Sequence, residues 1–404
     1  MQTQLADNIK NTAAGQTADT ILRRCVHCGF CTATCPTYQL LGDELDGPRG
    51  RIYLIKQLLE GKQVSRKTQT HLDRCLTCRS CETTCPSGVE YSHLLDIGRE
   101  ILAQRVRRPV LQTLLRKLLG MVLPNRTVFG ALVRIGYTVR AFLPKRMRNT
   151  LQYAGQVNTP WRDSEHKLQV ILLDACAQAD LAPNINLAAA RVLDKLGMRA
   201  IRLPHSCCGA LPHHMTEEER TLRMIKTNID HWWPQLNSNV KYIVSTASGC
   251  GVMVKDYGRL LKDDEDYAER AALISARCRD IVEVIAEQDL TALQIDAGRS
   301  VAVHTPCTLQ HGQKLNTAVD NILQRLGFDL CAVKEAHLCC GSAGTYSILQ
   351  PKISQQLLQN KLQALNVNRP QLIVTANIGC LLHLQSGSNV PVKHWIELLD
   401  SPAG

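Results

Sequence analysis

Eight of the 18 cysteines fall into two runs with the same spacing, C-x-x-C-x-x-C-x-x-x-C-P, which begin at Cys25 and Cys75. This spacing is typical of chains that hold two [4Fe–4S] clusters, in which three thiolates of one run bind a cluster and the fourth binds its neighbour. Zinc sites use paired C-x-x-C units with longer gaps, so zinc fits the spacing less well. The runs therefore predict one cluster on Cys25, Cys28, Cys31 and Cys85, and another on Cys75, Cys78, Cys81 and Cys35.

Eight further cysteines form a second repeated pattern. A cysteine after a strand-like segment, a Cys-Cys-Gly and a third cysteine motif recur at offsets of 130 to 132 residues, as a tandem duplication would leave them. The candidate metal ligands are Cys176, Cys207, Cys208 and Cys250 in the first copy, and Cys307, Cys339, Cys340 and Cys380 in the second. Cys278 and Cys331 lie outside the register, and we expect ordinary buried thiols there.

The group that these repeated thiols bind stays open at this point. A further iron–sulfur cluster or another thiolate-bound metal suits four thiols, while an inert tight turn and a redox-active vicinal disulfide are the alternatives. Several histidines lie near the motifs and are candidates for moving protons for a quinone, with ordinary polar roles as the alternative. They are His205, His213, His214, His304 and His311.

The elements around the cysteines predict the fold. Residues 47–61 read as a helix, with Pro48 in its first turn and an apolar stripe formed by Ile52, Ile55, Leu58 and Leu59. Each later repeat alternates three strand-like and two helix-like segments, which indicates βαβ units and parallel sheets. Because ligands gather at the carboxyl ends of parallel strands, we expect the three cysteine motifs of each copy to converge.

The fold class predicted is multidomain α plus α/β: a helical two-cluster ferredoxin domain followed by a tandem pair of βαβ-type domains that carry the Cys-Cys-Gly motifs. The expected boundaries are 1–100 for the ferredoxin-like domain, 101–165 for a helical linker, and 166–295 and 296–404 for the two repeats.

Charge and composition narrow the class of protein. The 404 residues carry a net charge of +11, yet aromatics are only 4% of the chain, too few for base-stacking nucleic-acid binders. We expect no nucleic-acid partner. The polar N-terminal segment does not resemble a signal peptide, and no run approaches the roughly 20 apolar residues of a membrane helix. We therefore expect the protein to lie in the reducing cytoplasm and its cysteines to bind metal rather than form disulfides.

The surplus of positive charge lies in residues 101–150, which contain no Asp or Glu. The basic side chains alternate with apolar blocks and predict one or two basic amphipathic helices, suited to an anionic membrane surface or to a partner subunit. They are Arg105, Arg107, Arg108, Arg116, Lys117, Arg126, Arg134, Arg140, Lys145, Arg146 and Arg148.

Together, CVHCGFCTATCPTYQLLGDELDGPRGRIYLIK, RCLTCRSCETTCPSGVEY, HLCCGSAGTYS and TANIGC resemble the glycolate oxidase iron–sulfur subunit family. The same architecture occurs in iron–sulfur subunits of anaerobic glycerol-3-phosphate dehydrogenase, in lactate utilisation proteins and in heterodisulfide reductase, and the resemblance covers roughly residues 20–400. It implies an electron-transfer subunit that works with flavin-binding subunits. These would oxidise glycolate, and in one alternative D-lactate, and pass electrons toward a quinone pool. The basic segment 101–150 is expected to place the complex on the inner face of the cytoplasmic membrane, near the quinone.

The chain departs from the heterodisulfide reductase pattern in one respect. Domains of that type end in a C-x-x-C pair, whereas Cys250 and Cys380 stand alone here, and His383 occupies the vacant position of the second repeat as a candidate substitute ligand. Three alternative functions remain: a terminal reductase of disulfide or quinone, the iron–sulfur subunit of a related hydroxy-acid or glycerol-3-phosphate dehydrogenase, and an iron–sulfur sensor.

The substrate chemistry is expected on another chain. A G-x-G-x-x-G motif after a strand and a P-loop motif are both missing, and side chains alone do not accept hydride. We therefore expect no catalytic residue in this chain and no activity when it is alone.

Overall fold

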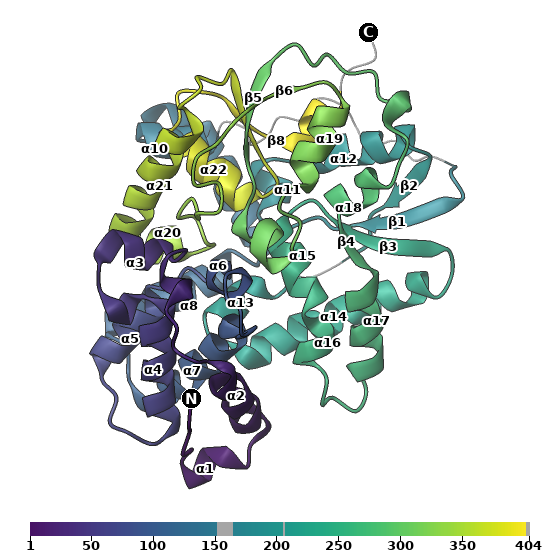
Figure 1. Cartoon of the computed structure of the whole chain (residues 1–404). Helices are drawn as coiled ribbons and strands as arrows, with labels where there is room; N and C mark the ends of the chain where they lie inside the picture. Colours follow the sequence, from purple (N-terminus) through teal and green to yellow (C-terminus); the bar gives the residue numbers. More distant parts are fainter. Residues whose placement is uncertain (152–164, 205–206, 401–404) are drawn as a thin grey trace. The chain divides into compact units, whose positions relative to one another are not determined.

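The computed structural model describes residues 1–151, 165–204 and 207–400 (Figure 1). The chain forms two compact units, and each consists of several segments. The first comprises Met1–Leu118, His214–Thr216 and His337–Lys361, and the second comprises Leu119–His213, Glu217–Ala336 and Leu362–Gly404.

The first unit is helical. Its elements are α1 (Asp7–Lys10), α2 (Ala13–Arg24), η1 (Phe30–Thr32), α3 (Pro36–Leu41), η2 (Glu44–Asp46), α4 (Pro48–Leu59), α5 (Arg66–Asp73), α6 (Ser80–Thr83), α7 (Tyr91–Arg105), α20 (Tyr346–Leu349), and most of α8 (Val110–Val122) and α21 (Pro351–Leu365). The helix predicted between the cysteine runs is confirmed as α4, which starts at Pro48 and buries its predicted apolar stripe.

A close approach of α4 to α7 builds the core of this unit. A Cβ atom at Gly98 of α7 would lie only 2.7 Å from Cγ1 of Ile55, so this contact requires glycine. The buried cluster also includes Leu22 of α2, Leu72 of α5 and Leu94 of α7, each with 0% exposure. Four helices, α2, α4, α5 and α7, therefore form the core that supports the loops carrying the cysteines.

The second unit contains two four-stranded parallel sheets among the residues described, with the orders β2-β1-β3-β4 and β6-β5-β7-β8. The first has β1 (Leu168–Leu172), β2 (Met198–Ile201), β3 (Val240–Ser245) and β4 (Cys278–Asp280); the second has β5 (Ser300–His304), β6 (Asp329–Cys331), β7 (Leu372–Thr375) and β8 (Val392–His394). The fold class is confirmed: a helical ferredoxin-like part and two repeats with parallel sheets. The short strands β4 and β8 escaped sequence analysis because each has three residues and runs directly into a following helix.

Helices connect and cover these strands. They are α9 (Arg126–Thr138), η3 (Arg140–Phe142), α10 (Lys145–Thr150), α11 (Gln178–Leu181), α12 (Asn184–Lys195), α13 (Ala210–His214, whose last residue belongs to the first unit), α14 (Glu218–Leu236), α15 (Ser248–Lys255), α16 (Tyr257–Leu260), α17 (Ala268–Arg277), α18 (Ile281–Ala286), η4 (Leu290–Ala292), η5 (Thr308–Gly312), α19 (Ala318–Arg325), α22 (Ile378–Gly387) and η6 (Trp395–Leu398). The central strands β1, β3, β5 and β7 are predominantly apolar and largely buried, as expected for parallel strands with helices on both faces.

The two repeats contact each other through polar groups that lie near the carboxyl ends of their strands. Ser248, at the start of α15, shares a 2.7 Å hydrogen bond with Thr308 and accepts one from Asn377 Nδ2 at 3.2 Å. The buried Asp280 accepts a hydrogen bond from Gln313 of the second repeat at 3.1 Å. The carboxyl ends of the strands of both repeats therefore face a shared region of the second unit.

Candidate functional site

Both N-terminal cysteine runs coil through left-handed residues at equivalent positions. In the first run, His27 and Gly29 have φ angles of 57° and 88°, and in the second, Thr77 and Arg79 have 54° and 60°. This conformation is uncommon for residues with a side chain and persists where the surroundings hold it. The two loops therefore share one backbone shape, which turns their first three cysteines toward a common centre.

The first group of thiols consists of Cys25, Cys28, Cys31 and Cys85, which line one pocket. Burial, together with the neighbouring Cys25 and Cys85, raises the pKa of Cys31 to about 11. Thiols in such a place become thiolates when a bound metal supplies the compensating positive charge. The fourth cysteine of the second run thus joins three from the first.

The second group of thiols combines the two runs in the opposite way. Burial raises the pKa of Cys81 well above its ordinary value, and Cys78, Cys75 and Cys35 act on it in the same direction. Cys35, the last cysteine of the first run, therefore lies with three cysteines of the second. Four sulfur donors in each group fit an iron–sulfur cluster in donor type and number.

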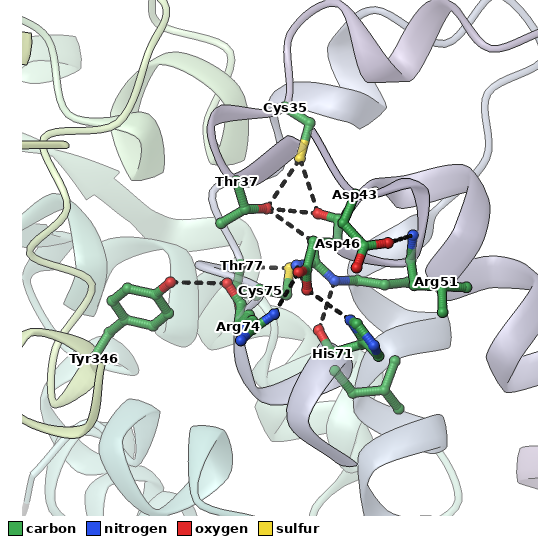
Figure 2. A network of polar contacts seen from close by, with 12 residues as sticks. Cys35, Thr37, Asp43, Asp46, Arg51, His71, Arg74, Cys75, Thr77 and Tyr346 are labelled. Carbon is green, nitrogen blue, oxygen red and sulfur yellow. Dashed lines mark hydrogen bonds and ion pairs between the residues drawn. The ribbon is translucent and has the colours of Figure 1, made fainter. Parts of the chain in front are cut away.

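A buried carboxylate lies beside the second group (Figure 2). Asp46 is fully buried and accepts a hydrogen bond from Arg74 Nη1 at 2.6 Å. Its Oδ1 lies 3.0 Å from His71 Nδ1 and 3.6 Å from Arg51 Nη2. Arg51, only 1% exposed, also donates from Nε to the His71 carbonyl at 2.8 Å. This set ties η2, α4 and α5 together next to the cysteines, and sequence analysis did not identify it.

A segment of the second repeat also belongs to the first unit and contacts this region. The hydroxyl of Tyr346 donates to the carbonyl of Arg74 at 2.9 Å, one residue before Cys75 (Figure 2). Tyr346 follows the buried pair Cys339 and Cys340 by a few residues. The Cys-Cys-Gly segment of the second repeat therefore packs onto the loop that carries the second group.

The first Cys-Cys-Gly repeat brings its four candidate ligands together. The Cys176 thiol lies 3.7 Å from Cys207 Sγ, and this hydrogen bond together with burial raises the pKa of Cys176 well above its ordinary value. Hydrogen bonds to Cys207 and Cys250 raise the pKa of Cys208, and burial adds to the effect. The convergence expected from the parallel strands is thus present here.

Buried polar side chains hold the vicinal cysteines of this repeat in place. Asn228 Nδ2 donates to the Cys207 carbonyl at 3.1 Å, and the Tyr257 hydroxyl donates to the Cys208 carbonyl at 2.9 Å. Asn228 and Tyr257 are both fully buried and hydrogen-bond each other. The loop is therefore anchored by α14 and α16, which leaves the four sulfurs facing one another.

The second repeat differs at one position. His304 ends β5, and one of its ring nitrogens lies within 4.8 Å of Cys380 Sγ. Counting from the first cysteine of each repeat, its counterpart is Leu173, a core residue. Cys307 leads into the π-helical turn η5, a form of helix that often occurs at functional sites. Sequence analysis identified His304 as a candidate proton carrier or an ordinary polar residue, and its place beside Cys380 adds a ligand-type nitrogen.

The other histidines are distributed around the repeats. His311 is buried within η5, and His383, the candidate substitute ligand, is half-buried on α22. His213 and His214 end α13. His205 lies outside the described residues.

The two cysteines outside the register behave differently from each other. Cys278 on β4 is fully buried, and burial raises its pKa to about 12, so the expectation of a buried thiol is confirmed. Cys331 on the edge strand β6 is only half-buried, so that expectation was wrong. An edge strand has a neighbouring strand along only one of its edges, which explains why Cys331 is partly exposed.

The basic segment forms α8 and α9, the predicted amphipathic helices. Part of its charge is used inside the fold, because Arg108 and Arg116 pair with Asp73, and Arg126 pairs with Asp174. Much of its apolar surface is exposed. The exposed side chains are Val110, Leu111, Leu114, Leu118 and Met121 on α8, and Val128, Leu132 and Ile135 on α9, followed by Val139 and Phe142.

In the described part of the chain, no single helix is long and apolar enough to cross a membrane. The consecutive helices α8 and α9 reach the required length and composition only when taken together, and the chain bends at the break between them.

Comparison with known families identifies both kinds of domain. A 4Fe-4S dicluster domain matches residues 21–89, and a cysteine-rich domain matches residues 170–255 and again 301–385. These ranges contain the two cysteine runs and the two Cys-Cys-Gly repeats, respectively.

Curated relatives share this arrangement. The glycolate oxidase iron-sulfur subunit of Escherichia coli is 52% identical over 99% of this chain and 98% of its own length. A probable glycolate oxidase iron-sulfur subunit of Bacillus subtilis is 29% identical over 95% of this chain and 94% of its own. Lactate utilization protein A of Bacillus pumilus is 25% identical over 58% of this chain and its whole length.

A solved structure, that of a hypothetical protein from Helicobacter pylori, shares the fold. Its TM-score is 0.52 at 11% identity, and the alignment covers 96% of this chain and 72% of the other.

Proposed function

Because the chain belongs to the family of glycolate oxidase iron–sulfur subunits, we propose that it carries electrons from a flavin on partner subunits toward a membrane quinone. The chain is an electron-transfer subunit of an oxidoreductase and holds iron–sulfur clusters of the 4Fe–4S type. The observation that carries the proposal is the exchange of Cys35 and Cys85 between the two cysteine runs, which gives two complete sets of four thiols.

The ligand assignment follows those sets. The first cluster is proposed on Cys25, Cys28, Cys31 and Cys85, and the second on Cys75, Cys78, Cys81 and Cys35. A bound [4Fe–4S] cluster supplies one-electron chemistry. The chain contributes the sulfur ligands, a buried setting and charged groups nearby, while oxidation of the hydroxy acid takes place on a flavin-binding subunit. Glycolate is the proposed substrate of that subunit, with D-lactate as a second hydroxy acid.

The Cys-Cys-Gly repeats are proposed to hold a further iron–sulfur cluster or another thiolate-bound metal. The candidate ligands are Cys176, Cys207, Cys208 and Cys250, and Cys307, Cys339, Cys340 and Cys380. The convergence of the first set supports a second candidate function, a terminal reductase of quinone or disulfide at this site. The proposed domains are 1–100, 101–165, 166–295 and 296–404.

A direct test uses the anaerobically purified complex. Iron and acid-labile sulfide should give about eight irons per chain if clusters are confined to the N-terminal part, and more if the repeats are filled. Glycolate should reduce the clusters, as seen by electron paramagnetic resonance (EPR), only when the flavin-binding subunits are present. Oxidation of glycolate by the isolated chain with an artificial acceptor would refute the proposal.

The exposed faces of α8 and α9 are proposed to bind an anionic membrane surface. Apolar side chains exposed on one face, in a segment without acidic residues, suit an in-plane helix with its cations near lipid headgroups. Arg107, Lys117, Arg134 and Arg140 are exposed cations of this segment.

Changing these four residues to Gln should release the complex from vesicles that contain anionic lipid. The matched control replaces four exposed cations elsewhere, Lys62, Lys67, Arg223 and Lys241. Equal vesicle binding by both variants would contradict the membrane proposal and favour a partner subunit on this surface.

A further inference from the structure

Hydroxyl and amide groups contact two sulfurs of the second group of cysteines, although both of these cysteines are buried. The hydroxyl of Tyr91, a residue only 4% exposed, donates to Cys75 Sγ at 3.6 Å. The Thr77 amide donates to the same sulfur at 3.4 Å, and the Thr37 hydroxyl lies 3.3 Å from Cys35 Sγ (Figure 2). Hydrogen-bonding groups therefore contact Cys75, which comes from the second run, and Cys35, which comes from the first.

Buried cations surround the same sulfurs. Arg51 donates from Nη1 to Thr37 Oγ1 at 3.1 Å, directly behind Cys35. Arg99, 8% exposed, donates from Nη2 to the carbonyl of Cys75 at 2.9 Å. Arg51 and Arg74 contact the buried carboxylate of Asp46. Together with Arg99 they are three cations against this one buried acid, which leaves an excess of positive charge beside the second group.

The first group is more open, although the Met1 amino group donates to the Cys25 carbonyl at 2.8 Å and Arg49 lines its pocket. Cys28 is exposed and Cys31 and Cys85 are half-buried, and the amide of His27 is the counterpart of the Thr77 contact. In the part of the chain that the structure describes, no hydroxyl hydrogen bond to a sulfur of the first group is found. The position equivalent to Tyr91, six residues after the last cysteine of its run, is Leu41 in the first run.

These differences act on the reduction potential of a bound cluster in opposite directions. Burial in a medium of low dielectric constant disfavours the extra negative charge of the reduced form, whereas hydrogen bonds to the sulfurs and nearby cations favour it. The second group is the more buried, so without compensation its cluster would be the harder one to reduce.

We propose that Tyr91 and Arg51 are positioning residues that raise the reduction potential of the cluster on Cys75, Cys78, Cys81 and Cys35, and so offset its burial. Tyr91 also lines the pocket of the first group, which places its ring between the two sets of thiols. The inference rests on the ligand assignment given under the proposed function.

The test is a potentiometric titration followed by EPR on the anaerobically purified complex. Tyr91→Phe, which keeps the ring and removes only the hydroxyl, should shift one of the two [4Fe–4S] signals to a lower midpoint potential and leave the other unchanged. Tyr53→Phe, at a half-exposed tyrosine of α4, is the matched control and should shift neither. Cys28→Ser identifies the signal of the first cluster, because it alters the line shape of that signal alone.

Unchanged potentials in Tyr91→Phe with full iron content, or a shift of the first signal instead, would overturn this inference and leave the proposed function standing. Missing clusters in the unaltered complex would instead refute the proposed function. Should Tyr91→Phe fail to assemble, Thr37→Val removes the hydroxyl between Arg51 and Cys35. The same signal should then shift downward, and an unshifted signal overturns the inference.

Discussion

The molecule contains two duplicated regions, and their copies are joined in different ways. In the N-terminal region each set of four thiols takes one cysteine from the other run, so each set needs both copies. In the C-terminal region the first repeat brings together four thiols of its own, and the repeats contact each other through buried capping residues instead. Because each N-terminal thiol set needs both runs, we expect that region to depend on bound metal for its integrity more than the region built on parallel sheets.

Two helix-capping residues connect the repeats. Asp280 ends β4 and caps α18, and His394 ends β8 and caps η6, each with a glutamate three residues later. Each contacts the other repeat, Asp280 through Gln313 and His394 through the Thr246 carbonyl at 2.9 Å. The equivalent positions therefore hold an acid in one copy and a base in the other, both buried.

Removal of iron should produce the largest difference between the two regions. Chelation under oxidising conditions should abolish amide-exchange protection in much of residues 1–106, because each cluster cross-links both runs and metal binding contributes to folding. Strands β1, β3, β5 and β7 should stay protected. Loss of protection in the sheets before the N-terminal helices would contradict this division.

The buried ion cluster of the N-terminal region should have the next largest effect. Arg51→Met leaves Asp46 with fewer partners and should lower the free energy of unfolding by about 3–5 kcal/mol, as for other broken buried pairs. Arg24→Gln, which removes an exposed pair with Glu90, is the control and should cost about 0–1 kcal/mol. Denaturant titration of both variants checks this, and equal losses would show that burial is not the cause.

The two caps should respond to pH in opposite senses. Burial raises the pKa of Asp280 to about 7 and lowers that of His394 to about 4. The folded state therefore retains a proton on Asp280 that the unfolded chain loses above about pH 4, so this group reduces stability as pH rises from about 4 to 7. His394 is neutral in the folded state, and its contribution is lost as pH falls from about 6.5 to 4.

In the unaltered protein these contributions offset each other, each being on the order of 3–4 kcal/mol. Asp280→Asn should leave a stability that rises with pH over this range, and His394→Asn one that falls. Thermal unfolding at several pH values measures both slopes. Parallel slopes in the two variants would show that the caps do not act in this way.

The smallest effect is expected where the repeats meet through hydroxyl groups. Ser248→Ala removes the 2.7 Å hydrogen bond with Thr308 and the contact from Asn377, and should cost about 1 kcal/mol. Ser238→Ala, at an exposed serine, serves as the comparison and should be close to neutral. A loss of several kcal/mol at Ser248 would mean that the repeats depend on each other more than their separate cores suggest.

Sequence reasoning reached furthest where spacing alone determines chemistry. The positions of eight cysteines and two prolines predicted which thiols group together, and apolar segments such as 169–175 and 301–305 predicted the parallel sheets. The strands β4 and β8 were missed because each has three residues and runs directly into a helix, so no apolar run marks it in the sequence. Their pairing depends on neighbours that are distant in sequence, Ile243 for Cys278 and Ile373 for Val392.

The surroundings of the second thiol group were also beyond sequence analysis. Asp46 lies in GDELDGPRGR, which reads as a polar turn before a helix, and nothing local shows that it receives Arg74 and His71 from α5 and the loop after it. Likewise, His304 looks like one of several histidines until β5 places it beside Cys380. Long-range contacts between polar residues leave no periodic signal.

The exchange of ligands between the cysteine runs is tested most directly by EPR on four single variants of the complex. Cys35→Ala should abolish the same cluster signal as Cys75→Ala, and Cys85→Ala the same signal as Cys25→Ala. Iron should fall by about four atoms per chain in each case. Loss of one signal in both Cys35→Ala and Cys25→Ala, with the other signal intact, would show that each run holds its own cluster and would contradict the account.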